Sequence, residues 1–559
     1  MSAALVIFKL VNVTTNNFFS ILLLAIVTYV AKYYIDYFNR PSKIPGPFPL
    51  PVIGNIHQLG GDLADATERF RKKYGEIFEF YTGNQRNIVV SRPDLAEKIW
   101  GPLSIKTTNF ILRNSYSEGI VELGLGTKGM LFNRDIESWA TNRKFMSQIS
   151  SPQFLREAVK ISTGMNDEVF KYWKIMEEEG IQVEIPEWMN ALGTDIVVMT
   201  TMGKKMFSTA ELFNKLNIKG KKAEIQGIWQ NGVKFAESIY LYNESMFFMM
   251  LLPPFIRTKF PFKTLNKKFL DNRDWINNTL EKIVAEKRKE MENAVLGQSR
   301  ESTILTLLPN TNTEKDLDKG KLLTDERLGS ILREVYTGGL DTTSNTLSFI
   351  TYYIAKHRDV YLKMREEIIK VYGTLDDPNL TFESYEKLKY IEAVIYEGIR
   401  IFPTIPMIGR AGVEDAKFDE FIIKADTTVY TDLKSLSNDP RYVKHPEKFD
   451  PDRFLNKEPI VKYSYLPFGN GVRMCPGRAW AMVQMKTYLV KLVSTFDIEL
   501  FNGRPDMMTM TKVKKAKKRV DMNRIGRSQK DPKKNINSYL FSTSDHLELA
   551  SSGTQTQFY

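Results

Sequence analysis

The residue most able to do chemistry in this chain of 559 residues is its single cysteine, Cys475. A lone thiol cannot form an internal disulfide, and structural zinc and iron–sulfur sites need several ligands. Three roles remain for it: inert packing, a nucleophile, or one axial ligand of a metal that another group already holds. The neighbouring residues decide between these roles.

The cysteine lies in a glycine-rich loop, Phe468-Gly469-Asn470-Gly471-Val472-Arg473-Met474-Cys475-Pro476-Gly477, which leads into a helical run over 478–493. Glycines allow sharp turns, close approach to a flat ligand, and backbone N–H groups that point at a sulfur. Arg473 can meet an anionic group of that ligand. Together with the positive end of the helix dipole, it favours the thiolate form of the cysteine. The loop therefore predicts a permanent thiolate.

This loop resembles the haem-binding signature of the cytochrome P450 haem-thiolate monooxygenases, Phe-x-x-Gly-x-Arg-x-Cys-x-Gly, at every fixed position. The resemblance implies that Cys475 is an axial ligand of the iron of haem b (iron protoporphyrin IX). It also implies that Phe468, Arg473 and Gly477 line the cofactor. Pro476 departs from the commoner aliphatic residue, yet a proline suits a first helical turn.

Two more motifs precede the loop in the order that this family shows. Glu397-Gly398-Ile399-Arg400 resembles its Glu-x-x-Arg helix, and Pro451-Asp452-Arg453-Phe454 resembles its Pro-x-Arg-Phe element. The resemblance implies a buried charge network of Glu397, Arg400 and Arg453 that supports the cysteine loop. Glu-x-x-Arg alone is uninformative, because most such pairs are solvated neighbours on one helix face.

A long helix is predicted further upstream. Thr324, Asp325 and Glu326 indicate its start, and apolar residues recur at helical spacing from Leu328 to Ile354. Its middle contains Gly338-Gly339, which costs about 1 kcal/mol per glycine relative to alanine. A close helix crossing would explain the pair. The resemblance instead implies room for dioxygen and water, beside Asp341 and Thr342 as an acid and an alcohol that pass protons.

Cationic residues elsewhere fit an anionic cofactor. Trp139-Ala140-Thr141-Asn142-Arg143 resembles the Trp-x-x-x-Arg helix of the family, which implies that Trp139 and Arg143 meet a haem propionate. Arg410 falls where the family often places another propionate arginine. The tryptophan motif alone is weak, since Trp and Arg four residues apart often stack on each other. Three arginines near one dianion are electrostatically favourable.

The composition, with 43% hydrophobic residues, suits a large catalytic body of long helices and short strands. A hairpin is predicted over 77–82 and 87–90, around Gly83-Asn84. The fold class implied is mainly α with a smaller β region, the cytochrome P450 fold, preceded by an N-terminal transmembrane helix. The expected parts are an anchor over 1–32, a proline-rich linker over 33–54, a catalytic domain over 55–505 and a basic tail over 506–559.

The anchor prediction rests on an uncharged run over 10–31, long enough to cross about 30 Å of hydrocarbon. Lys32, Arg40 and Lys43 follow the run while Lys9 precedes it, which places the catalytic domain on the cytoplasmic side. The stiff, proline-rich segment that follows is similar to that of family members in the endoplasmic reticulum. We therefore expect a single uncleaved anchor in the endoplasmic reticulum membrane.

Two other segments carry separate expectations. The apolar stretch over 246–256 is core or a lid that contacts the membrane, and in the second case polar substitutions at Phe247 and Phe248 weaken membrane retention. Residues 512–534 hold eleven cations against two acids, a net charge of +9. Because family members usually finish in a strand hairpin after 496–501, this tail predicts a departure from the pattern. A solvated or membrane-surface tail is favoured over nucleic-acid binding.

The resemblance implies insertion of one oxygen atom of O2 into a lipophilic small molecule. Electrons come from NADPH through NADPH-cytochrome P450 reductase, with cytochrome b5 as an optional second donor. The glycine spacing in 124–129 fits a dinucleotide loop but lacks the strand–helix–strand context and the later acid, so it predicts an ordinary loop. The alternatives are a haem-thiolate isomerase or dehydratase, a haem sensor, and a cysteine hydrolase, which would need a histidine partner.

Overall fold

Helices build most of the protein. A computed structural model describes residues 3–60, 63–114, 117–126, 128–225, 232–293, 325–455, 460–501 and 507–512. The longer helices are α1 (Ala3–Phe38), α3 (Leu63–Tyr74), α6 (Ile136–Met146), α7 (Pro152–Glu178), α8 (Ile185–Met202), α10 (Gly232–Leu251), α12 (Lys263–Asn293), α14 (Asp325–Gly339), α15 (Asp341–Lys356), α16 (Arg358–Tyr372), α17 (Lys389–Ile401) and α19 (Arg478–Thr495). The shorter ones are α2 (Ile56–Leu59), α4 (Pro93–Trp100), α5 (Glu118–Glu122), α9 (Ser208–Lys215), α11 (Pro254–Arg257) and α18 (Leu433–Asn438).

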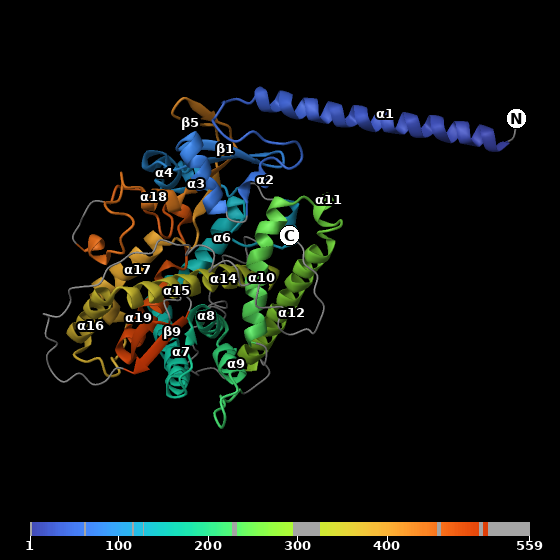
Figure 1. Ribbon diagram of the computed structural model, residues 1–559. Helices are drawn as coiled ribbons and strands as arrows, with labels where there is room; N and C mark the ends of the chain where they lie inside the picture. Colours follow the sequence, from blue (N-terminus) through green and yellow to red (C-terminus); the bar gives the residue numbers. More distant parts are fainter. Residues whose placement is uncertain are drawn as a thin grey trace.

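The largest hydrophobic core lies among helices α7, α8, α15 and α19, which gather in one layer of the body (Figure 1). Helix α19 is buried almost all round and packs along α7, as expected for an apolar helix in the middle of a large domain. Buried hydroxyls also join the layer, since Tyr488 on α19 lies 3.1 Å from Thr351 on α15. The helix predicted over 478–493 is confirmed, two residues longer.

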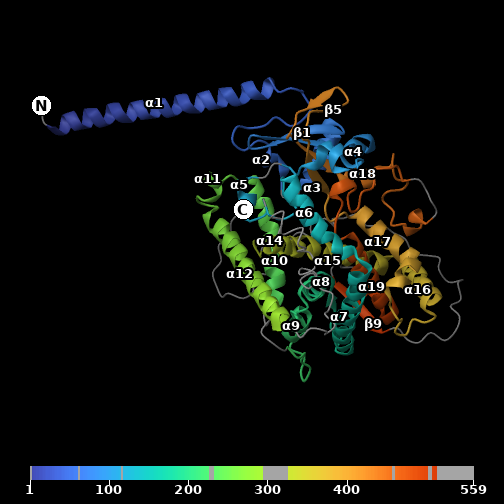
Figure 2. The same cartoon turned by 180° about the vertical axis from the view of Figure 1, so that it is seen from behind.

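The main sheet has four strands in the order β1-β2-β7-β4. Strands β1 (Ile77–Thr82) and β2 (Gln85–Val90) form the predicted hairpin, with Gly83 at a φ of +60° in the turn. Strand β2 runs parallel to β7 (Thr428–Asp432), which pairs antiparallel with β4 (Met407–Ala411). A small separate hairpin joins β5 (Ala416–Phe418) to β6 (Phe421–Ile423). This β region lies at one end of the body, away from the core helices (Figure 2).

The carboxyl side of the body corrects one prediction. Strand β8 (Phe496–Leu500) pairs antiparallel with β9 (Met507–Lys512), and β9 also pairs with β3 (Val183–Glu184). The sequence analysis predicted a departure from the strand hairpin of the family, but β8 and β9 form such a hairpin. Strand β9 lies beyond residue 505, where the catalytic domain was expected to end; its sequence alternates methionine with threonine and runs directly into the basic tail. Residues 513–559, with almost all of the basic tail, lie outside the described residues.

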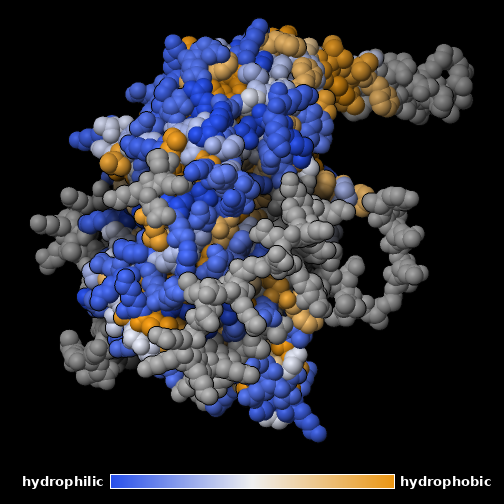
Figure 3. Space-filling model, turned by 60° about the vertical axis from the view of Figure 1, so that its left-hand side comes forward, coloured by the Kyte–Doolittle hydropathy of each residue, from blue (hydrophilic) through white to orange (hydrophobic). Residues whose placement is uncertain are grey.

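Helix α1 extends from the body as a long rod whose apolar surface is visible where it leaves the domain (Figures 1 and 3). Its segment Phe19–Phe38 is long and apolar enough to cross a membrane. The helix continues to Phe38, so the boundary expected at 32 falls inside it. The last part of α1 and the residues after it contact the β1–β2 hairpin. The Tyr29 hydroxyl donates a hydrogen bond to Asn84, and Arg40 forms an ion pair with Glu79 at 2.6 Å.

The stretch over 246–256 divides into two environments. Helix α10 ends at Leu251, and the two prolines that follow lie at the start of α11. Phe248 lies between the rings of Phe262 and Phe269, which makes it part of the core. Phe255 and Phe260 are 63% and 95% exposed and Phe247 is 37% exposed. The exposed face therefore includes Phe247, whereas Phe248 packs inside; the effect of polar substitutions at these residues on membrane retention stays a prediction.

Candidate active site

The Cys475 loop is held by its own backbone and by α4. The Cys475 amide donates to the carbonyl of Phe468 at 2.9 Å, and Phe468 is half-buried. Gly469 and Gly471 have φ near +70°, and a Cβ at Gly471 would lie 2.6 Å from the Pro102 carbonyl oxygen. Only glycine fits at both positions. These two glycines therefore allow a close approach to the protein's own backbone. The sequence analysis had instead predicted a close approach to the ligand.

The half-buried Cys475 thiol differs from the predicted thiolate environment. Burial raises the pKa of Cys475 above its ordinary value, and this is the largest effect on the group. The backbone N–H groups of Gly477 and Arg478, and the charges of Arg143 and Arg113, act in the opposite direction. Gly477 thus contributes a donor at the start of α19, with an ordinary φ of −84°. The N–H groups that point at sulfur are confirmed, while Arg473 is not among these largest influences.

Four arginines converge near this loop, and we call Arg113, Arg143, Arg410 and Arg473 the arginine cluster. Burial and the neighbouring charge of Arg113 lower the pKa of Arg473 to about 9, and burial lowers that of Arg410 well below its usual value. Burial also lowers the pKa of Arg143. Within the described part of the chain, none of the four forms an ion pair with a carboxylate.

Their contacts are with carbonyl oxygens and aromatic rings. Arg473 donates to the carbonyls of Ile111, Met130 and Asn133 at 3.0, 3.2 and 2.9 Å, and its guanidinium lies 4.1 Å from the centroid of the Trp139 ring. Arg410 stacks 4.4 Å from the Trp100 ring. Trp139 on α6 therefore stacks on Arg473, which belongs to the cysteine loop and is far from α6 in the sequence.

Arg113 was missed by the sequence analysis. It follows an isolated bridge between Leu112 and Ala411, which brings it beside Arg410 on β4. Its Nε atom is buried and has no hydrogen-bond partner among the described residues, and burial lowers its pKa to about 10. A lone arginine after the apolar run Phe110-Ile111-Leu112 carries no spacing signal, so only the fold brings it to the site.

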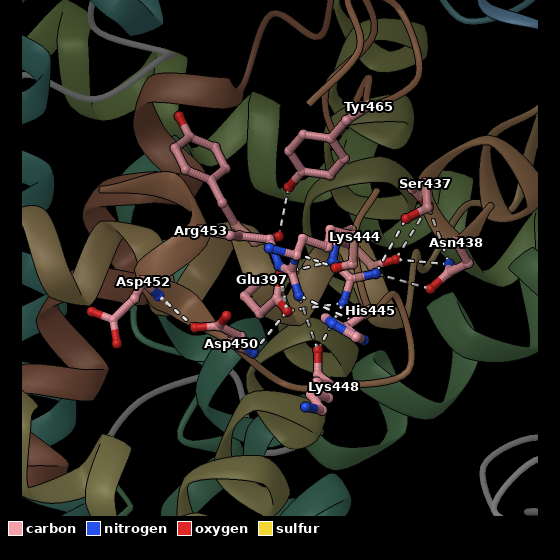
Figure 4. Close-up of polar contacts among 12 residues, drawn as sticks. Glu397, Ser437, Asn438, Lys444, His445, Lys448, Asp450, Asp452, Arg453 and Tyr465 are labelled. Atoms are coloured by element: carbon pink, nitrogen blue, oxygen red, sulfur yellow. Dashed lines mark hydrogen bonds and ion pairs between the residues drawn. The ribbon is translucent and has the colours of Figure 1, made fainter. Parts of the chain in front are cut away.

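The predicted charge network is assembled as expected (Figure 4). Glu397 and Arg400 are fully buried and meet through two hydrogen bonds of 2.7 and 2.8 Å, and Arg453 reaches Glu397 at 3.1 Å. The remaining guanidinium donors reach carbonyls, among them that of Lys448 from Arg400. Each charge therefore has an opposite charge or carbonyl partner, which is the condition for a stable buried ion pair. We call Glu397, Arg400 and Arg453 the supporting network.

The helix predicted over 328–354 is interrupted. Helix α14 begins at Asp325, Thr324 lies outside the described residues, and a single residue, Leu340, separates α14 from α15. The Thr342 hydroxyl donates to the Gly338 carbonyl at 2.7 Å, and the Asn243 amide of α10 donates to the Thr337 carbonyl at 3.2 Å. A Cβ at Gly338 or Gly339 would meet nothing within 4 Å. The glycine pair therefore borders open space and is not a close helix crossing.

Asp341 lies at this break between two amides. Burial raises its pKa, while hydrogen bonds from Asn345 and Asn243 act in the opposite direction. The Asn345 bond measures 2.9 Å. Asp341 is thus an acid that neutral donors hold in place beside the open space, next to the Thr342 hydroxyl.

The glycine spacing over 124–129 does not build a nucleotide site. Gly124 packs against the Arg333 side chain, and a Cβ at Gly129 would lie 2.1 Å from the Glu334 carboxylate. Thr127 lies outside the described residues, and the next helix, α6, begins only at Ile136. Gly124 and Gly129 therefore pack against side chains of α14, in a segment predicted to be an ordinary loop.

The residues present fit a flat, dianionic cofactor with a metal centre. The described residues include a sulfur before α19, a glycine-bordered space at α14 and α15, and cations with no acid partner, one of which has a buried, unpartnered Nε. Buried charges without partners are costly, so these cations indicate an anionic ligand. A protein with this helical fold and this site is a haem-thiolate enzyme.

Residues 44–523 match the cytochrome P450 family, and the chain belongs to that family. It is similar to cytochrome P450 3A6 of Oryctolagus cuniculus, with 28% identity over 464 residues, which covers 82% of this chain and 87% of that protein. It is also similar to cytochrome P450 3A14 of Cavia porcellus, with 28% identity over 472 residues, 83% of this chain and 87% of that protein. Cytochrome P450 3A9 of Rattus norvegicus is 26% identical over 458 residues, 82% and 85% of the two chains.

The family makes the protein a cytochrome P450 monooxygenase with a haem-thiolate cofactor. It inserts an oxygen atom into lipophilic compounds with electrons from a reductase. The match begins before residue 55 and ends after residue 505, so it is longer on both sides than the predicted catalytic domain.

Proposed function

We propose that Cys475 is the thiolate ligand of the haem iron in this monooxygenase. The observation that carries the proposal is the position of the sulfur, which lies in the glycine loop before α19 next to Gly477, with the Cys475 amide bonded to the Phe468 carbonyl; the amides of Gly477 and Arg478 and two arginines lower the thiol pKa there. Such N–H donors stabilise a buried thiolate by replacing the hydrogen bonds that water would give it. The bound haem supplies dioxygen activation, and a thiolate ligand favours cleavage of the O–O bond.

The arginine cluster binds the two propionates. The sequence predicted this role for Arg143, Arg410 and Arg473. We add Arg113, because it lies beside Arg410 and its charge lowers the pKa of Cys475. Trp139 orients Arg473 by stacking on it. Two carboxylates next to four guanidinium groups give the charge balance that the cluster lacks. Phe468 and Gly477 fix the loop that carries the sulfur.

Asp341 and Thr342 hold and pass protons next to the open space at Gly338 and Gly339. A carboxyl whose pKa is raised by burial exchanges protons nearer to neutral pH than an exposed one. The Thr342 hydroxyl bonds the Gly338 carbonyl and can turn from it toward the open space. Glu397, Arg400 and Arg453 act further away, by fixing the segment that leads to the cysteine loop.

The remaining assignments follow from the anchor and the family. Helix α1 supports a single N-terminal span in the endoplasmic reticulum membrane, with the catalytic domain on the cytoplasmic face. NADPH-cytochrome P450 reductase is the electron donor, and cytochrome b5 is an optional second one. The domain runs from the proline-rich segment through β9. The exposed Phe255 and Phe260 near α11 form a second membrane contact.

The test is the absorption difference spectrum of the dithionite-reduced protein with and without CO, for wild type and Cys475→Ser. A strongly red-shifted Soret band in wild type that is lost in Cys475→Ser would support thiolate ligation. Serine preserves the size of the side chain and removes only the sulfur. A band typical of histidine-ligated haem in wild type, or the same band in both proteins, would exclude Cys475 as the ligand.

A further inference from the structure

A buried acid that the proposed mechanism does not use lies next to the arginine cluster. Glu334 is on α14, one helical turn before Gly338, and its side chain is buried. One carboxylate oxygen accepts the backbone N–H groups of both Met130 and Leu131. The other oxygen has no hydrogen-bond partner among the described residues and faces Gly129, where only a hydrogen atom fits.

The segment that Glu334 binds is the same one that Arg473 binds. Arg473 donates to the carbonyls of Met130 and Asn133, so the two side chains hold the backbone of 129–133 through its donors and its acceptors respectively. The Asn142 amide adds a bond to the Gly129 carbonyl at 2.8 Å. This segment leads directly into α6, which carries Trp139 and Arg143.

Glu334 is also the acid that acts on the arginine cluster. Its charge opposes the loss of charge on Arg113 and Arg473, which burial would otherwise discharge. A nearby negative group favours the ionised form of buried guanidinium groups before an anionic ligand arrives. It is not hydrogen-bonded to either arginine within the described residues, so it occupies none of their N–H donors.

We infer that Glu334 is a positioning residue for the haem propionates, which anchors the 129–133 segment and keeps the arginine cluster ordered and charged for them. The inference rests on the proposed function, because the cluster is the proposed propionate site. Residues that orient the ligands of a metal cofactor typically change its affinity by about 10–100-fold when they are replaced.

The test compares Glu334 with Glu367, a carboxylate with the same backbone contacts elsewhere. Glu367 on α16 accepts the N–H groups of Tyr390 and Ile391 at 2.6 and 2.9 Å, at the start of α17. Glu334→Leu and Glu367→Leu each leave two amides unsatisfied. Haem-loaded wild type and both variants are mixed with excess apomyoglobin, the rate of haem transfer is followed in the Soret region, and the free energy of unfolding is measured in parallel.

We expect haem transfer from Glu334→Leu to be at least about 10-fold faster than from wild type, and transfer from Glu367→Leu to stay within about twofold at a similar loss of stability. Equal acceleration in both variants would reduce Glu334 to a structural role and overturn the inference. Slower transfer from Glu334→Leu would also overturn it, since the acid would then repel the propionates.

If Glu334→Leu does not fold, Glu334→Gln decides the question. Glutamine can still accept the two N–H groups through its carbonyl oxygen, but it carries no charge and places an NH2 group where the second oxygen faced Gly129. Faster haem transfer than from Glu367→Gln supports the inference, and an equal rate overturns it. The CO spectrum keeps this result separate from the proposed function. A wild type without the thiolate band refutes the role of Cys475, whereas the transfer rates still report on Glu334.

Discussion

Two groups of buried arginines in this protein differ in what surrounds them. In the supporting network, Arg400 and Arg453 share Glu397, and their other donors reach backbone carbonyls. In the arginine cluster, Arg410 and Arg473 are as deeply buried, yet neither forms an ion pair within the described residues. A charge paired within the fold stabilises the fold, while one left unpaired is held ready for a ligand.

The comparison predicts its largest effect at Glu397. Glu397→Gln removes the carboxylate that two buried guanidinium groups share, and breaking such a network costs about 3–5 kcal/mol. We expect the variant to lose that much unfolding free energy in chemical denaturation, or to accumulate without haem. Glu157→Gln is the control, because Glu157 pairs with Lys160 at the same three-residue spacing but on an exposed helix face. It should change stability by less than about 1 kcal/mol. Similar losses in both variants would contradict the comparison.

The second prediction exchanges one arginine from each group for leucine. Arg400→Leu leaves Glu397 short of one of its two cations and should lower the unfolding free energy by about 3 kcal/mol. Arg410→Leu removes a cation that no acid balances in the fold, so the stability of the haem-free protein should be unchanged or higher. Haem transfer to apomyoglobin from Arg410→Leu should instead be about 10–100-fold faster. If Arg410→Leu unfolds as readily as Arg400→Leu, the two groups do not differ.

The same contrast explains what the sequence could predict. Glu397, Arg400 and Arg453 were predicted because their motifs resemble those of the family and occur in its order, although the three-residue spacing alone is uninformative. Cys475, Trp139 and Arg473 were predicted from the same kind of short, ordered motif. Arg113 and Glu334 carry no such signal, since they reach the site through a single β-bridge and through the packing of α14 on the 129–133 segment.

Errors in the fold prediction have related causes. The β8–β9 hairpin was missed because β9 adjoins the basic tail, and because its second partner, β3, lies far away in the sequence. The break at Leu340 was not predicted because helical periodicity continues across it. Local patterns predict elements well, whereas a strand's partner and a helix's interruption depend on distant residues.

The third prediction concerns pH and Glu334. Burial raises the pKa of Glu334 from 4.5 to about 7, against the opposing effects of the Met130 and Leu131 amides and the charges of Arg333 and Arg113. The folded protein therefore binds more protons than the unfolded one between these values. Its stability falls as pH rises through this window, by an amount on the order of 1–3 kcal/mol.

Glu334→Gln cannot titrate, so the stability of wild type relative to this variant should fall between pH 5 and pH 8. The measurement is the unfolding free energy of both proteins at several pH values at constant ionic strength. A relative stability that rises with pH would mean that the neighbouring arginines dominate over burial. Glu334 would then belong with the paired charges of the supporting network.

The smallest effect is expected at Asp341, which fits neither group because two neutral amides hold it. Asn243→Leu removes the donor from α10 to Asp341 and to the Thr337 carbonyl while it keeps the size of the side chain. A lost hydrogen bond of about 1 kcal/mol should lower the product formed per NADPH consumed by roughly fivefold. The CO spectrum and haem transfer rate should not change, because the arginine cluster is untouched. Asn272→Leu is the control, since Asn272 binds α10 at the Ser238 carbonyl and does not reach Asp341. If both variants lower the product formed per NADPH equally, the position of α10 matters and the Asn243 amide does not. If only Asn243→Leu lowers it, an acid held by neutral amides is a third way to keep a buried charge available for chemistry.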